Sequence, residues 1–94
     1  MAIVVIDHAP GFTAEQWEAL QQQLRESTNP PRGIVAQLAG PFEGGWRVIS
    51  VWESQEAYET FRRERLAPVI QQMGIVDQLQ ISPLHSVMFV PQQH

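Results

Sequence analysis

The stretch GGWRVISVWESQEAYETFRRERLAPVI, residues 44–70, contains the signals of a turn, a strand and a long helix in direct succession. Its leading glycines, Gly44 and Gly45, predict the turn, because glycine adopts positive φ at little cost. Alternating β-branched and aromatic residues then predict a strand over residues 46–52. Ser54 is a favourable helix N-cap, and apolar residues recur at helical spacing after it. The stretch therefore predicts a turn–strand–helix unit to which the other elements attach.

The sequence before this unit predicts a strand, a helix and a second strand. Residues 2–8 (AIVVIDH) form an apolar run of strand length. Thr13 begins TAEQ, a capping box, and the helix that it opens is expected to extend to about residue 27. Residues 33–38 (GIVAQL) predict the second strand, and residues 39–45 a loop that joins it to the third.

The sequence after Ser54 predicts an interrupted helix and a last strand. Pro68 lies inside the helical pattern, so we expect a kink or restart there and a shorter segment that ends at Gly74. Residues 75–81 are expected to form a connector. Residues 84–90 (LHSVMFV) are rich in β-branched and apolar side chains and predict the fourth strand.

The element order β-α-β-β-α-β predicts the ferredoxin-like α+β fold. Right-handed crossovers give a four-stranded antiparallel sheet in the order 4-1-3-2, numbered along the sequence, with both helices on one face. The strands are apolar on both faces; Ile3 and Val5 point one way, and Val4 and Ile6 the other. Because two helices cover only one face, we expect a second copy to cover the other, which gives a homodimer through the sheet face.

Length and composition exclude several classes of protein. We expect residues 1–94 to form a single domain, because 94 residues are enough for only one. The net charge of −4 does not indicate the positively charged surface that nucleic-acid binding requires. No apolar run is long enough to span a membrane. The chain has no cysteine, which excludes thiol catalysis and thiolate metal sites, and no lysine, which excludes Schiff-base chemistry. We expect a cytoplasmic protein that needs no cofactor.

Residues 51–54 (VWES) and 56–58 (EAY), in a chain of this length and element order, resemble the dimeric α+β barrel superfamily, and within it the antibiotic-biosynthesis-monooxygenase-like group. The resemblance implies a small cofactor-independent oxidoreductase. In that group a tryptophan matching Trp52 and a tyrosine matching Tyr58 line a pocket between sheet and helices. The group also has an asparagine four residues before the tryptophan, where this sequence has Val48.

The pocket that the resemblance implies predicts a site for a small hydrophobic or aromatic ligand. Trp52 and Tyr58 would hold a flat phenolic molecule, with Trp46 and Ser50 as further substrate-binding residues on the same strand. Tyr58 would also act in catalysis by fixing the substrate oxygen. The alternative is that these side chains only fill the core, which is the commoner use of aromatic residues at such spacing.

Two histidines are candidates for the general base. His8 ends the first predicted strand and His85 begins the fourth, so the two are expected to lie side by side, with Asp7 or Glu53 to orient one of them. Imidazole changes charge near neutral pH, which suits a proton acceptor. The alternative is a pair of inert residues at the strand ends. Two histidines without a carboxylate at ligand spacing do not predict a metal site.

The haem-degrading members of the superfamily that the sequence resembles have an axial histidine on or just after the second helix. This sequence has arginines there instead, so haem binding is not expected. We expect these residues, Arg62, Arg63 and Arg65, to form a solvated helix face. The sequence thus predicts a cofactor-independent monooxygenase-like enzyme that acts on a small aromatic or polyketide-like substrate. The alternatives are a non-catalytic ligand-binding or structural homodimer and a histidine-dependent cyclase or isomerase.

Overall fold

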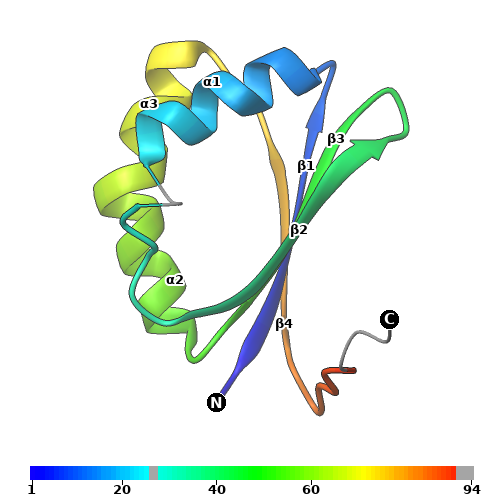
Figure 1. Ribbon diagram of the computed structural model, residues 1–94, viewed down its shortest axis with the longest axis vertical. Coiled ribbons are helices and arrows are strands. Elements are labelled where there is room, and N and C mark those ends of the chain that lie inside the picture. The colour runs from blue at the N-terminus through cyan, green and yellow to red at the C-terminus, as the bar shows by residue number, and fades with distance from the viewer. Residues whose placement is uncertain (26–27, 91–94) are drawn as a thin grey trace.

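The protein is a four-stranded antiparallel sheet with helices packed on one of its faces (Figure 1). The structure, a computed structural model, describes residues 1–25 and 28–90. Its elements are β1 (Ile3–Pro10), α1 (Ala14–Leu24), β2 (Ile34–Phe42), β3 (Gly45–Trp52), α2 (Gln55–Phe61), the π-helical segment η1 (Arg62–Leu66), α3 (Ala67–Met73) and β4 (Gln78–Pro83). The strand order β2-β3-β1-β4 confirms the predicted order and the ferredoxin-like α+β fold.

A tight turn of two residues joins β2 to β3. Glu43 and Gly44 both have positive φ, 45° and 72°. Two-residue hairpin turns whose twist matches that of the strands require positive φ at these positions. The predicted loop over residues 39–45 is therefore wrong, because β2 continues as a strand as far as Phe42. Gly40 and Pro41, which suggested a loop, lie in the last part of β2, an edge strand, where both residue types are tolerated.

The predicted helix starts are confirmed. The hydroxyl of Thr13 accepts a hydrogen bond from the Gln16 backbone at 3.2 Å, and the Gln16 side chain accepts one from the Thr13 backbone at 2.9 Å. This capping box opens α1, which ends at Leu24; the predicted end near residue 27 lies outside the described residues. Ser54 caps α2 with its Oγ, which accepts a hydrogen bond from the Ala57 backbone N–H at 3.1 Å.

The second helical stretch restarts near Pro68, as predicted. Pro68 lies in the first turn of α3, and Gly74, with φ of 70°, caps its end. Proline lacks an N–H and crowds the carbonyl four residues before it, so a regular α-helix cannot continue through this position. The chain responds with the wider π-helical turn η1, in which the Ala67 N–H donates to the carbonyl of Arg62.

The last strand differs from the prediction. It is β4, Gln78–Pro83, whereas residues 84–90 belong to none of the strands in the described part of the chain. β4 pairs antiparallel with β1, from Gln78 beside His8 to Pro83 beside Ile3. Its sequence QLQISP alternates polar and apolar residues, which is typical of an edge strand, while the prediction followed the more apolar segment.

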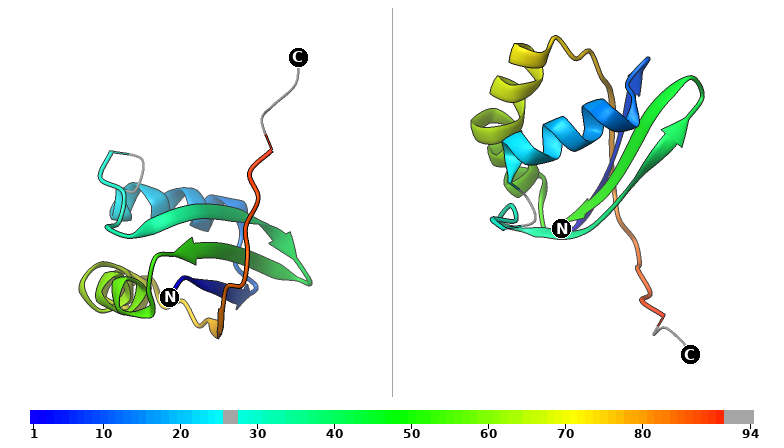
Figure 2. Two further views of the ribbon diagram at one scale, coloured as in Figure 1. Left: turned by 90° about the horizontal axis from the view of Figure 1, so that it is seen from below. Right: turned by 45° about the horizontal axis from the view of Figure 1, so that its top comes forward.

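The two faces of the sheet have different surroundings. The inner face lies against the helices, and its core consists of Ile3, Val5, Phe12, Leu20, Leu24, Trp52, Tyr58, Phe61 and Ile70. The opposite face, here called the outer face, has no described helix over it (Figures 1 and 2). Register places two apolar rows across it, Val4–Val51–Ala36 and Ile6–Ile49–Leu38. No helix among the described residues is long and apolar enough to cross a membrane.

Candidate active site

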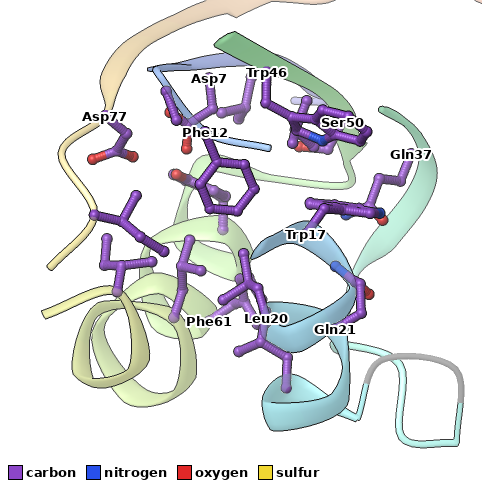
Figure 3. Close-up of a pocket in the computed structure, with 18 of the residues that line it drawn as sticks. Asp7, Phe12, Trp17, Leu20, Gln21, Gln37, Trp46, Ser50, Phe61 and Asp77 are labelled. Atoms are coloured by element: carbon purple, nitrogen blue, oxygen red, sulfur yellow. The ribbon is translucent and has the colours of Figure 1, made fainter. Parts of the chain in front are cut away.

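A cavity of about 70 Å³ lies between the inner face of the sheet and the helices (Figure 3). Aromatic and aliphatic side chains form most of its wall. The aromatic ones are Phe12, Trp17, Trp46, Trp52, Tyr58 and Phe61, and the polar ones are Asp7, Gln21, Gln37, Ser50 and Asp77. An apolar wall with a few polar groups is typical of a site for a small molecule.

Trp52 and Tyr58 line this cavity together. Their rings meet edge to face with centroids 5.4 Å apart, and the centroid of the Phe61 ring lies 5.3 Å from that of Trp52. The indole N–H of Trp52 donates to Ser50 Oγ at 2.8 Å, so the buried Ser50 holds the indole in place. Ser50 lines the cavity as well, but its oxygen already accepts this bond.

Trp46 contributes a second indole to the wall. It packs against Trp17, with ring centroids 5.8 Å apart, and against Phe12 at 6.4 Å. Its Nε1 is buried and has no hydrogen-bond partner among the described residues. A buried indole N–H normally has a partner, so this donor is available to a bound molecule.

A charged cluster closes the cavity beside Tyr58. Arg62 forms two parallel hydrogen bonds to the Asp77 carboxylate, at 3.0 and 3.1 Å, and donates to the Tyr58 hydroxyl at 3.1 Å. Asp7 Oδ2 lies 3.7 Å from the same guanidinium nitrogen. The other oxygen, Asp7 Oδ1, is buried without a partner among the described residues. The Arg62 guanidinium thus interacts with two carboxyl groups and with the Tyr58 hydroxyl.

The carboxyl groups in this cluster bind protons unequally. Burial, reinforced by the hydrogen bond to Asp77 and the negative charge there, raises the pKa of Asp7 to about 8, and Arg62 opposes this only in part. Burial is the largest single effect on Asp77 and acts to raise its pKa, but the hydrogen bonds from Arg62 and Asp7 and the positive charge of Arg62 together outweigh burial, so the pKa of Asp77 is lowered. Burial raises the pKa of Tyr58, which keeps its hydroxyl protonated. At neutral pH the carboxyl pair holds one proton, mainly on Asp7.

The elements that hold the cluster follow from local sequence. Asp7 shares the inner face of β1 with Ile3 and Val5, two residues apart each time. Arg62 begins the π-helical segment, four residues after Tyr58, which brings the two side chains onto one helix face. Asp77 lies in the short connector directly before β4, whose first residue, Gln78, pairs with His8, the neighbour of Asp7 in β1.

The histidines do not meet in this cavity. His8 pairs with Gln78 and Arg47, at the end of the sheet away from Pro83, and its Nε2 donates to the Phe42 carbonyl at 3.2 Å. His85 follows Pro83 at the opposite end and is exposed. The prediction that His8 and His85 lie side by side is therefore wrong, because it rested on the misplaced fourth strand. Neither of these two histidines lines the cavity.

Sequence reasoning missed three residues of the cluster: Asp7 as a cavity group, Arg62 and Asp77. Arg62 was expected on a solvated helix face, yet it is partly buried by its two carboxyl partners. The alternation of side chains along β1 could have identified Asp7, because an acidic residue two positions after the buried Val5 faces the same, buried side of the sheet. Asp77 has no such signal, since its partner Arg62 lies 15 residues earlier in the chain.

The fold is similar to that of several solved structures. A variant of SnoaB, a cofactor-independent oxygenase from Streptomyces nogalater, superposes with a TM-score of 0.69 at 10% identity, over 93% of this chain and 96% of that one. Rv0793 from Mycobacterium tuberculosis gives 0.67 at 15% identity, over 94% and 100%. A proposed antibiotic biosynthesis monooxygenase from Deinococcus radiodurans gives 0.58 at 14%, over 98% and 100%.

These similarities concern the fold. The chain has the α+β architecture of the antibiotic-biosynthesis-monooxygenase-like proteins, as the resemblance of its sequence predicted. No family model matches the sequence, and the curated proteins include no match to it. The function must therefore be argued from the cavity itself.

Proposed function

We propose that this protein is a cofactor-independent monooxygenase-like enzyme that oxidises a small phenolic substrate, with Asp7 as the proton acceptor. The proposal rests on two buried polar atoms in one aromatic cavity that have no hydrogen-bond partner in the described part of the chain, the acceptor Asp7 Oδ1 and the donor Trp46 Nε1. A phenol with a second oxygen substituent satisfies both. The similarity of the fold to SnoaB adds support.

The residues divide the chemistry as follows. Asp7 takes the proton of the phenol, and the Trp46 N–H stabilises negative charge on the second substrate oxygen. The electron-rich anion then reduces dioxygen: one oxygen atom bonds to a ring carbon, which loses its hydrogen, and the other leaves as water, protonated through Asp7. A phenol and dioxygen thus give a quinone and water, and the substrate supplies all the electrons. Trp52 and Tyr58 hold the ring.

Asp7 suits this task because its proton affinity is near working pH. With a pKa of about 8, it is a stronger base than an ordinary carboxylate and still ionises in mildly alkaline solution. Arg62 and Asp77 are positioning residues: the ionised Asp77 keeps the proton on Asp7, and Arg62 keeps Asp77 ionised. His8 and His85 take no part in this scheme.

Oxygen uptake tests the proposal. A panel of one-ring and two-ring phenols and hydroquinones is supplied to the protein, and we expect turnover that increases with pH through about 8. Replacing Asp7 by asparagine removes the base and should lower kcat by about 10²–10⁴-fold. Glu53→Gln, which neutralises an exposed carboxylate outside the cavity, should leave the rate unchanged.

Three outcomes separate the candidate functions. Uptake no greater than the uncatalysed background with every compound would remove the oxygenase. Conversion of a substrate in the absence of oxygen, lost in Asp7→Asn, would indicate a cyclase or isomerase that uses Asp7 as its base. Equal rates for wild type and Asp7→Asn would remove Asp7 from the mechanism.

The small volume of the cavity favours a second candidate, a non-catalytic dimer. An apolar cavity of roughly 150 Å³ accommodates benzene, so an aromatic ring needs more room than the present 70 Å³. Substrate binding therefore requires lining side chains to rotate outward. If the cavity binds no phenol, as measured by quenching of tryptophan fluorescence, the side chains serve only as a core, and this second candidate stands.

We also infer that two copies pair through the outer face. The two rows across β1, β3 and β2 present six apolar side chains that no described helix covers. The partly buried Arg47 lies at the margin, with its guanidinium over the Phe42 ring at 4.1 Å. An apolar centre with a polar margin is typical of an interface, and a two-fold pair buries the same patch twice.

Replacing Ile49 by glutamate should dissociate this dimer. Ile49 lies in the middle of its row, so the pair would bury two like charges near the centre of the interface. We expect sedimentation to show a dimer for the wild type at micromolar concentration and a dissociation constant raised at least about 100-fold in the variant. Val76→Glu, at an exposed site outside the face, is the control. A monomeric wild type would disprove the interface.

A further inference from the structure

The wall of the cavity contains two acidic side chains and no basic one. Asp7 and Asp77 both line it, whereas Arg62, which contacts both of them, is not among the lining residues. Arg62 gives its two parallel hydrogen bonds to Asp77, at 3.0 and 3.1 Å, and its nearest nitrogen is 3.7 Å from Asp7. One guanidinium thus faces two carboxyl groups and neutralises mainly Asp77, so the cluster is one positive charge short.

The described part of the chain offers Asp7 no second cation. The titratable groups that face it are Asp77, Arg62 and Tyr58, and its partners across the pairings with β3 and β4 carry no charge. The Oδ1 atom of Asp7 is buried and has no hydrogen-bond partner among these residues. The chain compensates by keeping a proton on Asp7, because burial, the hydrogen bond to Asp77 and the negative charge there raise the pKa of Asp7 to about 8.

The rest of the wall suits an organic cation. Three indoles line the cavity, those of Trp17, Trp46 and Trp52, and the face of an indole attracts a cation more strongly than other aromatic rings do. Asp7 pairs with Val48, two residues from Trp46, so the carboxyl group and an indole lie close together on the inner face (Figure 3). A metal ion fits less well, because no three acidic, histidine or cysteine side chains of the described residues gather as ligands.

We propose that the cavity binds a small aromatic amine in its protonated form, with the ammonium group donating to Asp7 Oδ1 and the ring held among the indoles. The ammonium takes the place of the proton on Asp7, so two carboxylates then face two cations. This goes beyond the proposed oxidation and does not depend on it. A phenol can satisfy the same oxygen, but it leaves the cluster one positive charge short.

Exchange of a proton for a cation gives the binding a characteristic pH dependence. Below about pH 8 the amine competes with the proton on Asp7, so its affinity should increase about tenfold for each pH unit. Above that pH Asp7 is already ionised, and the affinity should level off. Each amine that binds at pH 7 should release close to one proton, whereas a neutral ligand of the same shape should release none.

Calorimetric titration with benzylamine tests the proposal, and benzyl alcohol is the neutral ligand of nearly the same shape. Titrations at pH 7 in two buffers of different ionisation enthalpy give the number of protons released. At pH 8 we expect benzylamine to bind about 10–100-fold more tightly than benzyl alcohol, the range that a hydrogen bond between charged groups supplies. Asp7→Asn should lose this preference and the proton release but still bind benzyl alcohol, and Glu53→Gln, outside the cavity, should retain both.

The outcomes separate this inference from the proposed oxidation. A preference for benzylamine with proton release, both lost in Asp7→Asn, supports the cation site even if no phenol is oxidised. Benzylamine that binds no more tightly than benzyl alcohol, or binds without releasing a proton, would overturn the cation site and leave the oxidation to be decided by oxygen uptake. A preference that persists in Asp7→Asn would overturn it as well. If Asp7→Asn does not fold, the preference and proton release of the wild type decide.

Discussion

Replacing Trp52 by alanine should lower the free energy of unfolding by about 3–5 kcal/mol, the usual cost of truncating a large aromatic residue in a core. Trp52 is 1% exposed and packs against Tyr58 and Phe61. The change removes these contacts and also deprives the buried Ser50 hydroxyl of its hydrogen-bond donor. Denaturant unfolding followed by circular dichroism measures the loss independently of tryptophan fluorescence.

Two further variants separate packing from surface effects. Trp52→Phe keeps a ring between its aromatic neighbours and should cost clearly less than the alanine variant. Val76→Ala, at a site 78% exposed, should change the free energy by less than about 0.5 kcal/mol. All variants must be compared at one chain concentration, because the unfolding midpoint of a dimer depends on it. A loss below about 1 kcal/mol for Trp52→Ala would contradict the role of Trp52 as the centre of the core.

The part of the fold that the sequence predicted well depends on local signals. Ser54, Pro68 and Gly74 each act through the backbone of their own helix, so their effects can be read without knowing the rest of the structure. The strand order followed from right-handed connections between elements of known sequence order. Such rules apply to nearly any sequence with these signals.

The errors came from decisions that tertiary contacts make. Residues 84–90 are better strand formers than β4 by composition, but it is β4 that follows Gly74 after a three-residue connector and pairs with β1. The misplaced strand then put His85 beside His8, whereas His85 lies at the opposite end of the sheet, past Pro83. One shift in strand assignment thus changed the proposed chemistry.

The sequence predicted the aromatic residues of the candidate site but not its charged cluster. Trp52 and Tyr58 were named through the resemblance to the monooxygenase-like group, and both side chains line the cavity. The proton affinity of Asp7 could not be found in this way, because it depends on burial and on Asp77, 70 positions later in the sequence. Side chains that are distant in sequence and joined through one arginine leave no local pattern.

Replacing Asp7 by asparagine should remove a pH dependence of stability. The pKa of Asp7 is raised from 3.8 to about 8 on folding, so its contribution is fully present below about pH 4 and is lost as pH rises through 8. The slope is at most about 1.4 kcal/mol per pH unit. The pKa of Asp77 is lowered on folding, so Asp77 makes stability fall as pH decreases, and only at pH values below its ordinary pKa. Between pH 4 and 8, the change of stability with pH is therefore due to Asp7 rather than Asp77.

Asparagine resembles the protonated carboxyl in shape, and its amide can donate to Asp77 as that carboxyl does. We therefore expect Asp7→Asn to match the wild type near pH 5 and to be more stable at pH 8.5, when denaturant unfolding is measured at both values. Glu53→Gln, an exposed carboxylate, should keep the slope of the wild type. An unchanged slope in Asp7→Asn would show that Asp7 ionises as easily in the folded chain as in the unfolded one.

The sign of this effect bears on function. A carboxyl group that weakens the fold at working pH, and that asparagine would replace with a gain in stability, is not explained by packing or charge balance. If Asp7→Asn is both more stable at pH 8.5 and unable to consume oxygen with any phenol, the carboxyl group is retained for its proton transfer. If the variant is more stable and equally active, Asp7 is a structural feature of the cavity, and the base must be sought elsewhere in the chain.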